Sequence, residues 1–150
     1  ALEEEYKELE LEAFDYDGCV LGYNESGLGF YINNIVSVDD RYIYLSFKIK
    51  NTSNVVYKTD FIQFFINSKT RKDIQSTVSG KQPLNGTSLI EVEDIKPNEY
   101  KLFVYNFDTF SLSKRNNIQL IIDEGAKGRR LLSYELSYKD FYRNIRAYMP

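Results

Sequence analysis

A strict alternation of apolar and polar residues in the segment 41–51 limits what this chain can fold into. Apolar side chains occupy every second position there: Ile43, Leu45, Phe47 and Ile49. Successive side chains of a β-strand point to opposite faces, so this pattern predicts a strand with one face in a core and the other in water.

Other segments of strand length support the same fold class. Residues 60–67 and 100–107 are apolar on both faces, which is typical of strands covered on each side. Residues 118–123 and 130–136 alternate, and the glycines between them predict a hairpin loop. Weaker strands are expected at 30–38, 74–79 and 88–92, and turns are expected at Gly18, Gly22, Gly27, Gly29, Asp39-Asp40, Asn51 to Asn54, Pro83 to Gly86 and Pro97-Asn98.

About seven or eight short strands separated by frequent turns predict a mainly β chain, either a β-sandwich or a barrel. We expect an immunoglobulin-like β-sandwich. A short helix is expected to close the chain over 137–145, with Ser137 as its N-cap and with Phe141 and Ile145 facing inward. We therefore divide the chain into an acidic helix and linker, residues 1–28, and a β-sandwich domain, residues 29–150.

The acidic N-terminal segment reflects an uneven distribution of charge. Residues 1–40 hold eleven of the 22 acidic groups and one of the 19 basic groups, net −10, and the rest of the chain has a net charge of +7. Residues 2–14 have helical spacing, with an apolar stripe of Leu2, Tyr6 and Leu9 on a segment rich in glutamate. We expect this stripe to dock on the sandwich or on a neighbouring copy, with the acidic face toward basic loops.

The composition argues against catalysis. The chain has no histidine, which excludes Ser-His-Asp and Cys-His catalysis and imidazole metal sites. The single cysteine, Cys19, cannot form an internal disulfide or a thiolate metal cluster. Pairs of carboxylates such as Asp39-Asp40 lie in expected turns, where acidic residues are common. We therefore predict no enzyme activity, no cofactor and no metal, and no segment is long and apolar enough to span a membrane as a helix.

Basic residues in the expected loops leave a second function class open. Lys114 and Arg115 lie in one loop, and Lys127, Arg129 and Arg130 lie in another. Basic loops near aromatic side chains are typical of proteins that bind single-stranded nucleic acid. A solvated rim around a core of tyrosines and phenylalanines is the simpler interpretation. A carbohydrate-binding or adhesin-type sandwich is a third alternative, favoured only by exposed tyrosines.

The run from Asn51 to Ile66 resembles a signature of the TraN family of conjugative-transposon transfer proteins. Its pattern is Asn-x-Ser-Asn, then Tyr, then Asp-Phe-Ile and a strand rich in phenylalanine. Seven residues carry it: Asn51, Ser53, Asn54, Tyr57, Asp60, Phe61 and Phe64. The resemblance continues through Asp108-Thr109-Phe110-Ser111-Leu112, through residues 118–124 and through a glycine–arginine turn before Leu131, and it covers residues 29–148. Gln63 replaces an expected basic residue, and Lys127-Gly128-Arg129 replaces a Gly-Gly-Arg turn.

This resemblance implies a periplasmic, outer-membrane-associated part of a mating-pore apparatus. It implies the β-sandwich domain of a type IV secretion core, which acts through protein–protein contacts. The partners would be other subunits of the transfer apparatus, a small outer-membrane lipoprotein, or further copies of the chain within the assembly. The contact regions that we expect are the strands flanking residues 51–54 and the hairpin around Gly125 to Arg130, by addition of a strand to a sheet edge or by docking of a loop into a groove.

Overall fold

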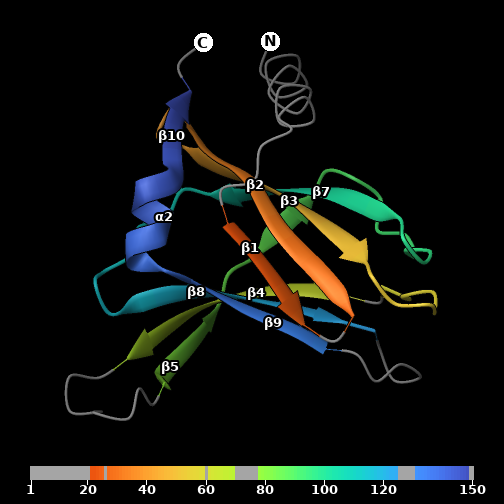
Figure 1. Cartoon of the computed structure of the whole chain (residues 1–150). Coiled ribbons are helices and arrows are strands. Elements are labelled where there is room, and N and C mark those ends of the chain that lie inside the picture. Colours follow the sequence, from red (N-terminus) through yellow and green to blue (C-terminus); the bar gives the residue numbers. More distant parts are fainter. Residues whose placement is uncertain (1–20, 26, 60, 70–77, 125–130, 149–150) are drawn as a thin grey trace.

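The computed structural model describes residues 21–25, 27–59, 61–69, 78–124 and 131–148. In these ranges the protein is a β-sandwich of two sheets with one short helix (Figure 1). In chain order the elements are β1 (Leu21–Glu25), β2 (Leu28–Val38), β3 (Tyr42–Asn51), β4 (Phe61–Lys69), β5 (Val78–Pro83), β6 (Gly86–Ser88), β7 (Tyr100–Asp108), β8 (Asn116–Asp123), β9 (Leu131–Ser137), α2 (Tyr138–Asn144) and β10 (Ile145–Tyr148). The prediction of a mainly β chain with a short C-terminal helix is confirmed.

The larger sheet has the strand order β1-β2-β3-β7-β6, and β10 pairs with β2 outside this path. β1 pairs antiparallel with residues 28–32 of β2, and β10 pairs parallel with residues 35–38. The register between β2 and β3 shifts between Ile32 and Asn34, where β2 changes from one partner to the other. The smaller sheet has the order β5-β4-β8-β9 and is antiparallel. Figure 1 shows the two sheets as stacked layers with α2 at their side.

The core between the sheets is built around aromatic rings. Phe47, at the centre of β3, is 0% exposed. Its ring stacks with those of Phe103 and Tyr105 on β7, at centroid distances of 5.5 and 5.9 Å, and meets Phe64 of the smaller sheet edge-on at 6.4 Å. Such ring pairs contribute about 0.5–1.5 kcal/mol each beyond the burial of their area. The apolar face predicted for the segment 41–51 is confirmed, since its four residues are buried: Ile43, Leu45, Phe47 and Ile49. The expectation that the opposite face lies in water is wrong at Tyr44 and Ser46, which are 3% and 1% exposed.

The outer face of the larger sheet carries a second apolar cluster. Four buried side chains form it: Val36, Val38, Tyr44 and Val104. Leu89 and Ile90 pack against this cluster from the segment after β6. The prediction of a strand over 88–92 is therefore wrong, because β6 ends at Ser88. After one further backbone hydrogen bond, from the N–H of Leu89 to the carbonyl oxygen of Val104, these apolar residues are partly buried by folding onto the sheet face.

The larger sheet begins earlier in the chain than the sequence pattern indicates. Gly22 and Gly29, which were expected in turns, lie inside β1 and β2. Gly27 does form a turn, with φ of 75°. The side chain of Tyr31 lies close to Gly29, where an ideal Cβ would be 2.7 Å from the Tyr31 hydroxyl oxygen. Residues 21–28, which the sequence assigns to a linker, thus contribute β1 and the buried Leu28 to the sandwich.

The C-terminal helix agrees with its prediction. The Ser137 hydroxyl accepts a hydrogen bond of 3.1 Å from the backbone N–H of Asp140, so Ser137 is the N-cap. Phe141 faces inward and is 2% exposed, and Ile145 packs partly buried against the same core. The strand β10, which follows without a break, was not predicted. Arg146 fixes it by donating a 3.0 Å hydrogen bond from Nε to Oδ1 of Asn34.

Several predicted features lie outside the described residues. They are the turn at Gly18, the N-terminal acidic helix with Leu2, Tyr6 and Leu9, and also Cys19, Asp60 and the hairpin loop with Lys127, Arg129 and Arg130. Within the described ranges, no helix has the length and apolar character needed to cross a membrane.

The chain crosses from the smaller sheet to the larger one between β5 and β6. β5 includes the last two residues of the strand predicted at 74–79, whose residues 74–77 lie outside the described ranges. It ends at Pro83, which has no N–H to donate. Gly86 then enters the larger sheet opposite Phe107. An ideal Cβ at Gly86 would lie 2.5 Å from Cε1 of Phe107, whose ring is buried. Glycine at this position allows the crossing segment to lie directly against the core.

We expect Gly86→Ala to lower the free energy of unfolding by about 1–3 kcal/mol, because the buried ring of Phe107 must shift to admit a methyl group. Gly80→Ala is the matched control, since its Cβ would meet only Cβ of Ser68, at the ordinary contact distance of 3.8 Å. Urea unfolding of both variants measures the difference. Equal midpoints for the two variants would contradict the close approach at Gly86.

Candidate functional site

The side chain of Asn51 joins three segments at one end of the sandwich. Asn51 is the last residue of β3 and is 0% exposed. Its Nδ2 donates to the carbonyl oxygens of Val55 at 2.7 Å and Ile95 at 2.9 Å. Its Oδ1 accepts from the backbone N–H of Ser53 at 3.0 Å and from the Ser53 hydroxyl at 2.6 Å. Both amide atoms of this buried side chain are therefore satisfied.

Backbone hydrogen bonds also join the loops at this end of the sandwich. The N–H of Asn51 donates to the carbonyl oxygen of Glu99, and the carbonyl oxygen of Asn51 accepts from Asn98, which has φ of 64°. The N–H of Thr52 donates to the carbonyl oxygen of Gly27. The turn that follows β3, the turn before β7 and the turn between β1 and β2 are thus joined by the neighbouring residues Asn51 and Thr52.

An isolated bridge closes the other side of this loop. Tyr57 and Ile95 exchange two backbone hydrogen bonds of 2.9 Å, and both residues are 0% exposed. The two loops lie side by side at the right of Figure 1, after the end of β3 and before the start of β7. The segment 51–57 is consequently anchored at both ends, by Asn51 and by Tyr57.

This anchored segment, which we call the Asn51 turn (residues 51–57), presents apolar side chains to solvent. Val55 is 65% exposed and Val56 is 37% exposed. The Ser53 hydroxyl also lies 3.0 Å from the carbonyl oxygen of Val55 and 3.3 Å from its N–H, so the backbone beside these valines is ordered. The turn thus holds two neighbouring apolar side chains at the surface.

The remaining residues of the signature have structural positions. Asn54 is exposed beside the valines. Phe64 is 4% exposed, and its ring contacts those of Tyr105 and Phe107, each at a centroid distance of 4.9 Å. Phe61 begins β4. The signature residues within the described ranges therefore build one turn and one core strand.

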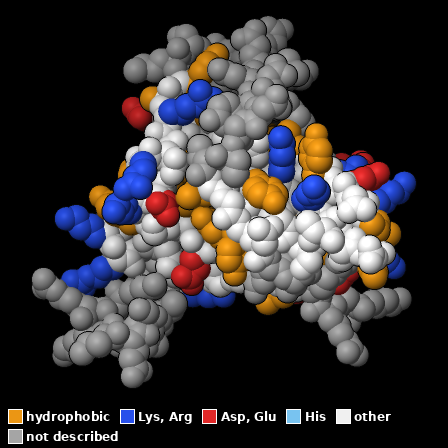
Figure 2. Space-filling view, in the orientation of Figure 1, with side chains coloured by type: hydrophobic (Ala, Val, Ile, Leu, Met, Phe, Trp, Pro, Cys, Tyr) orange, Lys and Arg blue, Asp and Glu red, His pale blue; other side chains and the backbone are white. Residues whose placement is uncertain are grey.

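Basic residues meet at a different part of the surface. Lys114 and Arg115, in the loop before β8, line a surface cavity of about 230 Å³ together with Lys139 of α2. Asn116, Asn117, Ser137 and Tyr138 complete it. Figure 2 shows lysine and arginine side chains gathered at the left rim, where α2 and the loop into β8 lie in Figure 1. Lys139 was not singled out from the sequence, because only the fold brings α2 beside the start of β8.

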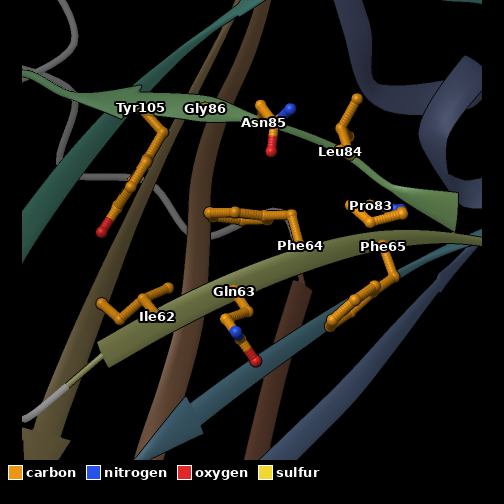
Figure 3. Close-up of a pocket in the computed structure, with 9 residues that line it drawn as sticks. All are labelled: Ile62, Gln63, Phe64, Phe65, Pro83, Leu84, Asn85, Gly86 and Tyr105. Atoms are coloured by element: carbon orange, nitrogen blue, oxygen red, sulfur yellow. The ribbon is translucent and has the colours of Figure 1, made fainter.

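A third feature, which the sequence analysis did not find, is a cavity of about 230 Å³ where β4 and the 83–86 segment diverge. Figure 3 shows the Phe64 ring between these two segments, while Gln63 and Phe65 point to the other side of β4. Tyr105 of β7 lies deep in this cavity and is 5% exposed. Burial raises the pKa of Tyr105 above its ordinary value of 10.0, and its hydrogen bond with Ser88 offsets only part of this rise. None of the nine lining residues is charged: Ile62, Gln63, Phe64, Phe65, Pro83, Leu84, Asn85, Gly86 and Tyr105.

A family model described as "Domain of unknown function (DUF4138)" matches residues 5–145. The chain belongs to this family. The match spans the sandwich and includes the Asn51 turn, both cavities and the strands that form them. The family description assigns no activity, so the chemistry of this DUF4138 domain rests on its own residues. No curated protein matches the chain.

Solved structures with some similarity include two of β-glucosidase from Kluyveromyces marxianus. One, of selenomethionine-labelled protein, has a TM-score of 0.40 and 13% identity, covering 79% of this chain and 15% of that chain. The other, in complex with glucose, has a TM-score of 0.36 and 14% identity, covering 77% and 15%. The chain thus spans less than a fifth of either enzyme's length.

We expect Asn51→Ala to lower the free energy of unfolding by about 3 kcal/mol, because it leaves the Val55 carbonyl and the Ser53 N–H without their buried partner. Asn54→Ala, in the same turn but exposed, should change it by less than about 0.5 kcal/mol. Chemical denaturation of the two variants measures both values. A small loss for Asn51→Ala would show that water replaces its side chain and that the turn is not fastened by it.

Proposed function

We propose that this domain is a non-enzymatic assembly module of a conjugative DNA-transfer apparatus, a type IV secretion-like machine of the cell envelope. It acts through protein–protein contacts and not through catalysis. The resemblance of residues 51–66 to the TraN signature supports the apparatus, and the absence of histidine supports a role without acid–base chemistry near neutral pH.

The observation that carries the proposal is the Asn51 turn. A buried amide with four hydrogen bonds holds a turn whose outer side chains are Val55 and Val56. A preorganised loop loses little conformational entropy when a partner docks on it, and the burial of exposed apolar area then contributes directly to affinity. The Asn and Ser of the signature therefore have a physical purpose in this proposal, which is to present the two valines in one fixed arrangement.

The proposed location is the periplasm, in association with the outer membrane. The proposed partners are other subunits of the transfer apparatus, a small outer-membrane lipoprotein among them, or further copies of this chain within the assembly. Such a partner would offer an apolar groove able to receive Val55 and Val56, because exposed apolar side chains gain most when a groove of matching shape buries them.

The test is the double substitution Val55→Asp with Val56→Asp in a donor cell that depends on this chain. Loss of two central apolar contacts of an interface typically weakens binding by about 30-fold or more. We expect the frequency of conjugative transfer to fall by at least this factor and the envelope subunits of the apparatus to be lost from the purified complex. The melting temperature should hardly change, because both side chains are exposed.

Leu131→Asp is the control for added charge, since Leu131 is 46% exposed and lies on β9 of the smaller sheet. It should leave transfer and co-purification intact. Unchanged transfer in the valine variant would show that the Asn51 turn is not the contact, and failure of the wild-type chain to recover any envelope subunit would contradict the assembly function itself.

A second candidate function is the binding of single-stranded nucleic acid at the cavity of Lys114, Arg115 and Lys139. In the part of the chain that the structure describes, none of these three side chains forms an ion pair; the salt bridge found there joins Lys101 and Glu93 at 2.9 Å. Unpaired cations around a hollow favour an anionic ligand.

A salt titration with a single-stranded oligonucleotide tests this alternative. For real binding, log Kd should rise steeply with log salt, and Lys114→Ala with Arg115→Ala should reduce the slope by about 1.4, since each phosphate contact contributes about 0.7. Lys50→Ala with Lys96→Ala removes the same charge elsewhere on the exposed surface and should leave the slope nearly unchanged. Equal slopes for both double variants would exclude this cavity as a nucleic-acid site.

A further inference from the structure

The strand β4 is paired along its whole length on one side only. On the side of β8 its register runs from Phe61 to Ser68. On the side of β5 the register begins only at Phe65, opposite Pro83, because the chain then leaves for the larger sheet. Among the described residues no strand lies beside the first part of β4 on this side.

The backbone groups of this first part point alternately to the two sides. The N–H of Leu84 donates to the carbonyl oxygen of Phe64 at 2.9 Å, so the backbone groups of Phe64 face the β5 side. Residues two apart in a strand direct their N–H and C=O to the same side. The N–H and C=O of Ile62 therefore face the open side, while those of Gln63 face β8.

The cavity of Figure 3 lies along this open edge. Its inner side is apolar, with Ile62 at the edge. The rings of Phe64 and Tyr105 meet edge-on there, with their centroids 4.9 Å apart. None of the residues that line it is charged. An unpaired charge buried there would be costly, which selects against a charged occupant.

We propose that the open edge at residues 61–63 of β4 receives an extended, uncharged strand from a partner polypeptide. The partner strand forms backbone hydrogen bonds with Ile62 in line with β5, and one apolar side chain opposite Ile62 fills the cavity against Phe64 and Tyr105. An extended backbone supplies a donor and an acceptor in the plane of the sheet, which is why the occupant is a polypeptide strand. The segment 83–86 closes the far end, so the pairing is about three residues or 10 Å long. This site is independent of the Asn51 turn.

Amide hydrogen exchange of the free protein gives the first test. The amide of Ile62 should exchange at least about 100-fold faster than that of Gln63, because only the latter donates to a neighbouring strand. The probe for binding is the amidated peptide Lys-Thr-Leu-Thr-Leu-Thr-Lys, whose leucines alternate with threonines and whose charges lie outside the pairing. Near-saturating peptide should slow exchange at Ile62 and shift the amide resonances of Ile62 and Phe64. A twin peptide that is N-methylated at both leucines lacks the N–H groups needed for the pairing and should not bind.

Two proline variants separate the open side from the paired side. Ile62→Pro removes an edge-facing N–H and the contacts of a partly buried side chain but keeps the ladder to β8, so the melting temperature should fall by about 4 °C. Gln63→Pro breaks that ladder and should lower the melting temperature by about 10 °C or more. Ile62→Pro should weaken the peptide about fivefold or more, the value of one backbone hydrogen bond. Val55→Asp with Val56→Asp should leave peptide binding unchanged, which separates this site from the assembly function.

Four results would overturn the proposal: slow exchange at Ile62 in the free protein, equal thermal losses in the two proline variants, equal binding of the N-methylated twin, and no binding at millimolar peptide. Resonance shifts centred away from β4 would equally assign the peptide to another surface and overturn it.

Discussion

The amide of Asn51 is the interaction on which one end of this sandwich depends. An asparagine can donate two hydrogen bonds and accept two, and here all four are made inside the protein. Its partners belong to the 53–55 turn and to the segment near Ile95, so a single side chain holds loops that are far apart in the sequence. A buried amide that lost these partners would cost more than it contributes when satisfied, and this asymmetry makes the position intolerant of substitution.

The strands that could be predicted are those whose burial is decided by alternation within one segment. β3, β4 and β7 each fill the core from one or both faces, and their patterns are unambiguous. β1, β6 and β10 are short, and each pairs with a strand already fixed by others, so their own residues carry little signal. The strand predicted at 88–92 is the opposite error, a strand expected where none forms. Leu89 and Ile90 pack against the face of the larger sheet, and such packing leaves the same apolar residues in the sequence as a strand would.

How much of each candidate site could be predicted depended on how far apart in the sequence its residues lie. The sequence predicts a turn over Asn51 to Asn54, and within this turn the N–H of Ser53 donates to the side chain of Asn51. That interaction spans two residues. The bond from Asn51 to Ile95 spans 44 residues, and the cavity beside Lys139 needs the helix α2 to return to the start of β8. Contacts of that range depend on topology, which local pattern does not encode.

The open edge of β4 also follows from topology. Among the described strands, β1, β5 and β9 have outer edges without a neighbour, but the open part of β4 differs from them because the segment 83–86 closes one end of it and a cavity lies beside it. Unpaired edges of long, flat strands aggregate, whereas an edge of about three residues closed at one end admits only a short strand. Such an edge loses little stability by remaining open and gains selectivity from the cavity beside it, because the side chain opposite Ile62 must fit between Phe64 and Tyr105.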